Sequence, residues 1–303
     1  MADNWLADGF NLPAVAARVG PFPGRDWLQT WWKHRGDGEL LIEETGDSLL
    51  TLVRRDRRIE FAGEPDLTDY HSPLGSPDVP ALRRLVRDLP GQTELVLDSL
   101  PAEATDGIIA VLRESGLQPT VEQHQVAAVL SLPGTFDDYL AAIGKKERHE
   151  LRRKRRRFDS EVGPGRVERR TGIAAVALFA DLHRRSSGDK GEFMTDEIEE
   201  FFLALHTHAA AVIDVLVDGS GRPASAIFSF EDGDGFYLYN SAFEPDLMSL
   251  SPGNVMLAHL IERSISEGKK VFDFLKGDET YKFRLGAEAR PLYRITATVG
   301  PRA

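Results

Sequence analysis

The sequence predicts an α+β fold built from two units. At 303 residues the chain is long enough for two domains of about 150 residues each. Its second half shows the clearer order of elements: a strand, two helices, three strands joined by hairpin turns, a helix, a strand, a short helix and a last strand. Strands joined by tight turns, with helices between the groups, are typical of an α+β domain. We place the division after residue 125, which gives units 1–125 and 126–303.

In the first half, a helix over 25–35 carries three tryptophans. Trp27 and Trp31 are four residues apart and mark one apolar face, so we expect them in the core. A loop rich in Pro, Gly, Asp and Ser spans 63–80. The remaining expected elements are strands 39–44, 48–54 and 58–62, helix 81–88, strand 93–98 and helix 103–115.

In the second half, Thr135 is expected to cap a helix that continues into a basic segment, because Asp138 completes an approximate capping box. Thr195 is expected to cap another helix. Turns rich in Asp and Gly separate three hairpin strands. The expected elements are strand 126–132, the helix from 135, strand 166–170, helix 173–185, a polar loop at 186–193, helix 195–211, strands 212–217, 223–230 and 235–242, helix 252–267, strand 270–275, a short helix from 278 and a strand at 292–299.

Composition excludes several classes of protein. The absence of cysteine excludes a disulfide framework, a cysteine-ligated zinc site and a thiol nucleophile. No apolar run approaches the roughly 20 residues that cross a membrane, and the first residues lack the pattern of a secretory signal. We therefore expect a cytoplasmic protein without membrane insertion. The net charge of −11 argues against DNA as a partner.

One segment reverses this acidic character. Lys145 to Arg157 contains nine Lys and Arg against two Glu, a local charge of +7 that leaves −18 for the rest of the chain. Such a segment either attracts phosphate or another polyanion, or forms a solvated helix face with pairs such as Glu150 and Lys154. The residues alone leave both interpretations open.

A set of short segments adds a resemblance to a known family. The segments are Trp27 to Trp32, Thr68-Asp69-Tyr70, Phe136 to Phe158, Leu182-His183-Arg184-Arg185 through Lys190-Gly191-Glu192-Phe193, Ser251-Pro252-Gly253, and Asp273-Phe274 with Tyr281-Lys282. Through their order and spacing the chain resembles the CelD-like acetyltransferases, a branch of the GNAT superfamily related to the Fem peptidyltransferases. The resemblance implies a GNAT fold, with two GNAT-like halves in tandem of which the N-terminal one is degenerate. It also implies transfer from acetyl-CoA or another acyl-CoA to an amine.

The strand over 235–242 is the first part of the expected donor site. In a GNAT fold the end of this strand separates from its neighbour, and its backbone binds the pantetheine amides and could polarise the thioester carbonyl. The residues that correspond are Tyr239, Asn240 and Ser241. By the strand period of two, Tyr239 and Ser241 share one face and Asn240 lies on the other. Plain aromatic packing is the alternative for the tyrosines.

The helix start at Ser251, Gly253 and Asn254 is the second part of the expected donor site. Ser251 can cap the helix, Pro252 suits its first position, and Gly253 allows close approach to the backbone. The free N–H groups and the helix dipole then favour a pyrophosphate. A simple helix start without a ligand is the alternative.

Three residues near the C-terminus are candidate catalytic groups. Asp273 lies in an otherwise apolar strand, so it is either a buried, partnered carboxylate or a general base with a raised pKa. By resemblance, Tyr281 is the acid that protonates the leaving thiolate. Lys282 corresponds to the lysine of the family's aromatic-Lys pair, and would stabilise the oxyanion or hold a substrate anion. A surface lysine paired with Glu279 or Asp278 is the alternative.

The acceptor is expected to be a small molecule with an amine, linked to a sugar nucleotide or another envelope precursor by family analogy. Residues expected to contact it are His183, Arg184, Lys190 and Arg152. His183 also fits a core stripe. The histidines at 206 and 208 are two residues apart on a helix and point in different directions, so we expect no metal.

The donor has alternatives, because the stretch from Phe243 to Gly253 departs from the usual GNAT phosphate loop. It lacks the doubled glycines, and Glu244 and Asp246 add negative charge. Some Fem relatives use aminoacyl-tRNA, so a tRNA-dependent transferase is one alternative. A non-catalytic GNAT scaffold that binds a polyanion through the basic segment is the other.

Overall fold

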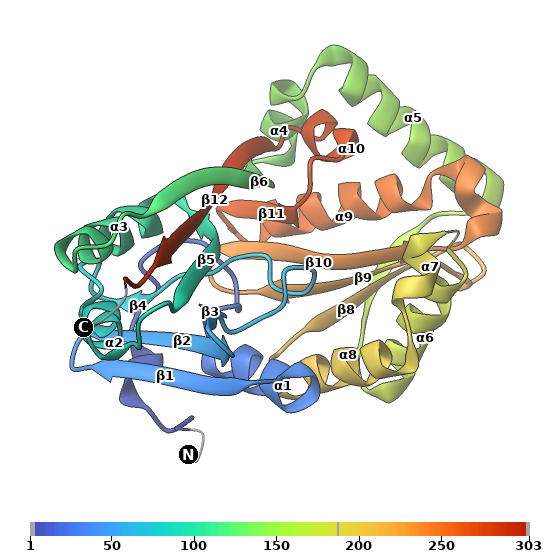
Figure 1. Ribbon diagram of the computed structural model, residues 1–303. Helices are drawn as coiled ribbons and strands as arrows, with labels where there is room; N and C mark the ends of the chain where they lie inside the picture. Colours follow the sequence, from blue (N-terminus) through green and yellow to red (C-terminus); the bar gives the residue numbers. More distant parts are fainter. Residues whose placement is uncertain (1–3, 187, 301–303) are drawn as a thin grey trace. The chain divides into compact units, whose positions relative to one another are not determined.

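The structure is a computed structural model that describes residues 4–186 and 188–300, with the side chains of Asp189 and Lys190 left outside the description. The chain divides into two compact units, Met1–Ala127 with Arg290–Ala303, and Ala128–Ala289. Two strands, β6 (Thr120–Ser131) and β12 (Glu288–Thr298), contain the points where the chain passes between units (Figure 1).

Unit 1 contains a mixed sheet with the strand order β1-β2-β3-β5-β12-β6. The hairpins β1-β2 and β2-β3 are antiparallel, β3 and β5 are parallel, and β5 is antiparallel to β12. The elements are η1 (Asp8–Asn11), α1 (Arg25–Arg35), β1 (Glu39–Thr45), β2 (Ser48–Arg55), β3 (Arg58–Phe61), β4 (Leu74–Gly75), α2 (Pro80–Asp88), β5 (Glu94–Pro101), η2 (Ala102–Ala104) and α3 (Thr105–Glu114).

The tryptophans of α1 lie in the core of unit 1, as the sequence predicts. Trp27 and Trp31 are 1% and 0% exposed. The edge of the Trp27 ring meets Phe22 at 5.3 Å between centroids. The indole N–H of Trp31 donates to Glu64, which also accepts two hydrogen bonds from Arg35. Burial of these rings fixes α1 against the rest of the unit.

Unit 2 has the strand order β6-β11-β10-β9-β8-β7. Strands β7 to β10 are antiparallel to their sequence neighbours, whereas β10 and β11 are parallel. The elements are α4 (Phe136–Ala142), α5 (Lys145–Val162), β7 (Arg166–Arg170), α6 (Ile173–Arg184), α7 (Asp189–Phe193), α8 (Asp196–His208), β8 (Val212–Val217), β9 (Pro223–Glu231), β10 (Gly235–Phe243), η3 (Pro245–Leu250), α9 (Pro252–Ser266), β11 (Val271–Lys276) and α10 (Thr280–Arg284).

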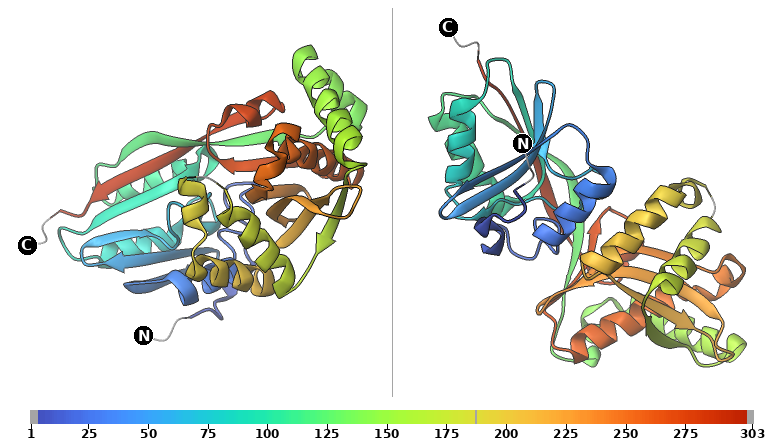
Figure 2. Two further views of the ribbon diagram at one scale, coloured as in Figure 1. Left: turned by 90° about the vertical axis from the view of Figure 1, so that its right-hand side faces the viewer. Right: turned by 90° about the horizontal axis from the view of Figure 1, so that it is seen from below.

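Helices cover both faces of the strands of unit 2 (Figures 1 and 2). Ile227 of β9 joins the apolar cluster formed with α9 and α5. The ring of its neighbour Phe228 packs against Phe179 of α6 and Phe202 of α8. Successive side chains of a strand point to opposite faces. Hence α9 and α5 lie on one face, and α6 and α8 on the other.

Local capping follows the sequence, with two corrections. The N–H of Asp138 donates to the Thr135 hydroxyl at 3.1 Å, and that of Ile198 donates to Thr195 at 3.3 Å. The expected continuous helix into the basic segment is wrong, because Gly144 separates α4 from α5. The polar loop at 186–193 contains the short helix α7. No helix within 4–186 or 188–300 has the length and apolar character to cross a bilayer.

A buried carboxylate holds together three elements of unit 2. Asp214 on β8 is 0% exposed and accepts two hydrogen bonds each from Arg263 of α9 and Arg169 of β7, at 2.6 to 3.3 Å. Burial alone would raise the pKa of the Asp214 carboxyl, but the arginine hydrogen bonds outweigh it and hold the pKa below its usual range. The ionised form therefore stabilises the folded unit.

We predict that Asp214→Asn lowers the free energy of unfolding by about 3 kcal/mol near neutral pH, because two arginines lose their carboxylate. The pKa of Asp214 is lowered in the folded state, so its contribution is complete above about pH 4 and is lost as the pH falls further. Urea unfolding should thus show a smaller difference between wild type and variant in acid. Asp246→Asn, at an exposed carboxylate, is the control and should change little. An acid-insensitive difference would contradict the prediction.

Candidate functional site

The parallel strands β10 and β11 separate inside the sheet of unit 2. Their register runs from Gly235 with Val271 to Tyr237 with Asp273 and ends there. Strand β10 continues to Phe243 on its other partner, β9, and β11 continues to Lys276. Main-chain groups on the facing edges beyond this point are not used by the β10-β11 ladder. The region between the two strands beyond Tyr237 and Asp273, hereafter the opening, is therefore bordered by main-chain edges that do not pair with each other, and amides of a ligand can pair with such edges.

A β-bulge lies where the two strands separate. Leu238 pairs with Ser229 and Asn240 with Phe228, so Tyr239 is the extra residue. The Tyr239 ring lies 5.6 Å from that of Phe202 on α8, and the Asn240 side chain contacts α6. Both side chains therefore point to the same face. The expectation that Tyr239 and Asn240 lie on opposite faces is wrong, because the bulge breaks the period of two.

Asn240 links the bulge to α6. Its Oδ1 accepts the N–H of Ser241 at 2.8 Å and lies 3.1 Å from Nε2 of His183. His183 is 1% exposed, and its ring lies between Phe179 and Phe193 at 5.8 and 5.7 Å. His183 thus lies on α6, on the face of β10 that this helix covers, and its ring nitrogen fixes the Asn240 side chain.

The start of α9 follows the end of β10 after the short 3-10 helix η3. Ser251 has left-handed backbone angles (φ 55°, ψ 52°), and its carbonyl accepts the N–H groups of Asn254 and Val255. Ser251 is thus at the cap position, as expected, but its hydroxyl makes no capping bond. A Cβ at Gly253 would meet no atom within 4 Å. The helix start is therefore open at Gly253, and its dipole favours an anion there.

The acidic residues before α9 are neutralised by arginines. Glu244 is 5% exposed and pairs with Arg185 at 2.8 Å and with Arg222 at 3.2 Å. Arg222 also reaches Asp246 at 3.7 Å. Burial would raise the pKa of Glu244, but hydrogen bonds from Arg185 and Arg222 hold it below its usual range. The negative charge noted in the sequence is therefore balanced locally and does not exclude an anionic ligand.

The end of β11 is held in an unusual backbone conformation. Leu275 has φ 58°, a left-handed value that is rare for a residue with a branched side chain. Its N–H donates to Oδ1 of Asp273 at 2.7 Å, and Asp273 is 0% exposed. This carboxylate therefore compensates for the sharp turn at the strand end, which agrees with the partnered alternative considered for Asp273.

Lys282 fixes the connection that follows. Its Nζ donates to the Lys276 carbonyl at 2.6 Å, lies 3.5 Å from the carbonyls of Leu275 and Gly277, and pairs with Glu279 at 2.9 Å. The residue is 3% exposed. Lys282 therefore pairs with Glu279, as in the alternative interpretation of the sequence. It is not a surface lysine, however, because its side chain is buried and its ammonium contacts the main-chain carbonyls between β11 and α10.

Tyr281 lies beside this connection. Its ring meets Phe274 edge-on at 6.2 Å between centroids. Burial, together with the charge of Glu279, raises the pKa of Tyr281 to about 12. The phenol is therefore protonated over the whole ordinary pH range and is available as a donor.

Arg184 and Arg152, two of the expected acceptor residues, lie on helices that cover opposite faces of the unit 2 strands. Arg184 bonds to the Met194 carbonyl and to the carboxylates of Asp196 and Glu199, which ties it to the start of α8. Lys190 belongs to α7, and its side chain lies outside the described part. Arg152 is exposed on α5, on the other face of the sheet. Leu275 is a residue that sequence reasoning missed, since a leucine gives no signal of a left-handed backbone.

Within the described residues, no group of His, Cys, Asp or Glu is arranged to hold a metal ion.

The chain is similar to known proteins in one segment of its sequence and in its fold. Residues 145–283 match a family model described as an acetyltransferase (GNAT) domain. A conserved protein of unknown function from Bacteroides thetaiotaomicron has 11% identity and a TM-score of 0.68, covering 96% of this chain and 95% of its own. FemX has 11% identity and a TM-score of 0.62, with 94% and 93% covered. L-PGS from Bacillus licheniformis has 12% identity and a TM-score of 0.56, with 93% of each covered. No curated protein matches.

These similarities confirm the α+β GNAT fold that the sequence predicts. The structural similarities extend across both units, and the segment that matches the GNAT acetyltransferase domain, 145–283, lies entirely within unit 2. At 11% to 12% identity the structural matches show the fold alone. The CelD-like assignment stays a prediction, as do the roles of individual residues.

We predict that Lys282→Met lowers the free energy of unfolding by about 1–3 kcal/mol, because the variant keeps the apolar stem and removes the donor to buried carbonyls. Urea unfolding measures this loss. Lys146→Met, at an exposed lysine of α5, is the matched control and should be nearly neutral. Equal stability of Lys282→Met and wild type would show that the buried ammonium does not hold the β11-α10 connection.

Proposed function

We propose that this protein is an N-acyltransferase that moves an acyl group from acyl-CoA to an amine. The observation that carries the proposal is the separation of β10 from β11 after Tyr237, with a bulge at Tyr239, directly before the open start of α9. In a GNAT fold this combination suits a donor that has both amides and a diphosphate. The GNAT domain match over 145–283 supports it.

In the proposed complex the pantetheine arm of the donor lies in the opening between the strands. Its amides pair with the edge of β10 around Tyr239, Asn240 and Ser241. Because the Ser241 N–H now donates to Asn240, the donor competes with that contact. The diphosphate lies at the α9 start, near Gly253 and Asn254. The arginines beside Glu244 keep this region from repelling it.

The reaction is a direct attack of the amine on the thioester. The C–N bond forms, the C–S bond breaks, and the thiolate leaves as the amine loses a proton to water. We propose that the Tyr281 phenol gives a proton to the leaving thiolate and regains one from water, since the phenol is protonated at every ordinary pH. Asp273 and Lys282 then act by positioning the strand end, because their polar atoms bond to main-chain groups of 275–277.

The acceptor is proposed by analogy alone to be an amine on a sugar nucleotide or another envelope precursor. Aminoacyl-tRNA as the donor, and a non-catalytic scaffold, are the competing functions.

Titration with CoA, a panel of acyl-CoAs and aminoacyl-tRNA tests the donor. Calorimetry should show heat with acyl-CoA, and a ligand at 100 times its Kd should add about 2.7 kcal/mol of stability, a rise of a few degrees in Tm. Binding of aminoacyl-tRNA without acyl-CoA would replace the proposal with the tRNA-dependent function. Binding of neither would favour the scaffold.

We predict that Gly253→Asp weakens acyl-CoA binding about tenfold or more, because a carboxylate at the open helix start repels the diphosphate. Its folding stability should be equal or higher, since an acidic residue in the first helical turn is favourable. Gly134→Asp is the matched control, because that glycine is also open to solvent. Calorimetry with acetyl-CoA measures both. Equal affinity of the two variants for acetyl-CoA would show that the diphosphate does not bind at the start of α9.

We predict that Tyr281→Phe lowers kcat about 100-fold and leaves the KM for acyl-CoA nearly unchanged, because only the proton donor is removed. The ring keeps its packing against Phe274, so the melting temperature should be retained. Release of the CoA thiol with an amine acceptor measures turnover. Unchanged kcat, or an effect on KM alone, would remove Tyr281 from the chemical step.

A further inference from the structure

Helix α5 forms the outer layer of unit 2, beyond α9 in Figure 1. Its apolar residues Leu151 and Phe158 are 4% and 0% exposed and pack into the core of the unit. The remaining faces carry the nine Lys and Arg of the basic segment. Because Leu151 and Phe158 are buried, the exposed surface of α5 is formed mainly by its charged side chains.

Only part of this positive charge is compensated within unit 2. Glu150 pairs with Arg153 and Lys154, and Arg155 pairs with Glu262 of α9. The cations that are exposed and form no ion pair with any residue in 4–186 or 188–300 are Lys145, Lys146, Arg152, Arg156 and Arg157. At 1.5 Å per residue, this stripe extends over about 18 Å of the helix.

A hollow of 300 Å³ lies between α4 and α5 and combines two kinds of surface. Its floor is apolar, and arginines form its rim. The floor and rim residues are Phe136, Leu140, Leu151, Arg152, Arg155 and Arg156, of which Arg155 pairs with Glu262. Asp159 also lines the hollow, but its carboxylate accepts the Gly165 N–H. The hollow therefore offers positive charge directly beside apolar surface.

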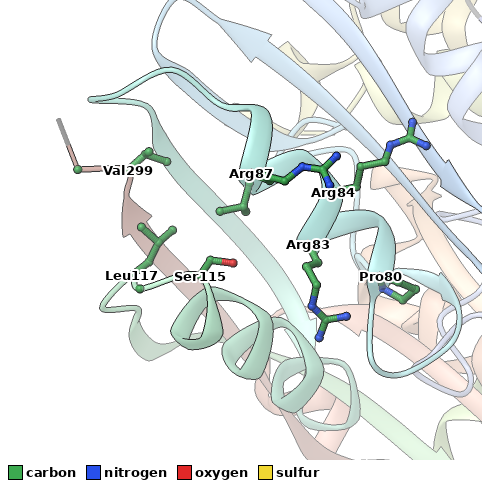
Figure 3. A pocket seen from close by; sticks show the side chains of 10 residues that line it. Pro80, Arg83, Arg84, Arg87, Ser115, Leu117 and Val299 are labelled. Atoms are coloured by element: carbon green, nitrogen blue, oxygen red, sulfur yellow. The ribbon is translucent and has the colours of Figure 1, made fainter. Parts of the chain in front are cut away.

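A second arginine-lined hollow lies in unit 1 (Figure 3). Arg83, Arg84 and Arg87 of α2 line a space of 720 Å³. Each of them pairs with a carboxylate, on Glu114, Glu43 and Asp88 respectively. These three arginines equal in number the exposed, unpaired Arg152, Arg156 and Arg157 of α5, but each of them already has a carboxylate partner.

We propose that α5 docks this protein onto an anionic phospholipid surface. Clusters of four to eight Lys and Arg on one helix bind such surfaces, and each cation adds about fivefold to the affinity. The charge of −18 on the rest of the chain opposes contact through other faces, so the basic stripe sets the orientation. Because Leu151 and Phe158 are buried, the docking is electrostatic and reversible by salt.

The apolar floor of the hollow favours lipid over a nucleic acid strand. In a phospholipid the phosphate lies beside hydrocarbon, which matches arginines beside Phe136 and Leu140. A single strand needs exposed aromatic rings on which its bases stack. Among the residues in the described ranges, the exposed large apolar side chains are those of Leu6, Val121, Ile173 and Met248, and none is aromatic.

Vesicle sedimentation of the full chain, without any acyl donor, tests the proposal independently of acyl transfer. The vesicles contain phosphatidylcholine alone, or equal parts of phosphatidylcholine and phosphatidylglycerol. The test variant is Arg152→Gln with Arg156→Gln and Arg157→Gln, and the matched control is Arg83→Gln with Arg84→Gln and Arg87→Gln. We expect binding to the anionic vesicles only, a loss on the order of 100-fold in the test variant, and little change in the control.

Three results would overturn the proposal. They are equal binding to neutral and anionic vesicles, equal loss of binding in the two triple variants, and binding that persists in high salt.

A further experiment titrates tRNA at the same ionic strength. Binding of tRNA that depends on α5, without vesicle binding, would assign the helix to nucleic acid instead. The Tm of each variant checks its folding. If a variant folds poorly, salt and vesicle-charge series on the wild type still distinguish these outcomes.

Discussion

The requirement that main-chain hydrogen-bonding groups be satisfied governs the site. When β10 and β11 separate after Tyr237, both strands lose ladder partners in the middle of a sheet. Side chains replace part of what is lost: Asn240 accepts the Ser241 N–H, Asp273 accepts the Leu275 N–H, and Lys282 donates to carbonyls after β11. The opening thus persists because these side chains bond to its backbone edges.

Arginine pairs stabilise unit 2 at two buried carboxylates. Asp214 on β8 lies opposite Ile227 of β9, which lies opposite Ser241 of β10, and it is held by Arg169 and Arg263. Glu244, directly after β10, is held by Arg185 and Arg222. In each case the buried carboxylate is ionised because its arginines outweigh the effect of burial on the pKa. Both ion-pair clusters therefore lie in the part of the sheet where β10 has separated from β11.

The sequence predicts the parts of this fold that depend on periodicity and on local hydrogen bonds. Hydroxyl caps at Thr135 and Thr195, and the buried stripe of Trp27 and Trp31, require only neighbouring residues. The bulge at Tyr239 and the left-handed Leu275 depend on contacts with other elements, so no local pattern reveals them. The burial of Lys282 is equally hidden, because its carbonyl partners come from a turn whose path is set by tertiary structure.

The same ion-pair reasoning separates two groups of arginine in unit 2. An arginine that holds a buried carboxylate cannot leave it for a ligand without exposing the remaining partner to a large desolvation cost. Arg185 and Arg263 are therefore committed to the fold, even though one of them lies close to the proposed donor site. Arg152 and Arg156 form no ion pair with any residue in the described ranges, and their guanidinium groups remain hydrated in the free protein. A polyanion or an anionic surface gains most from unpaired cations, so external binding should depend on α5 and acyl transfer on the opening in the sheet.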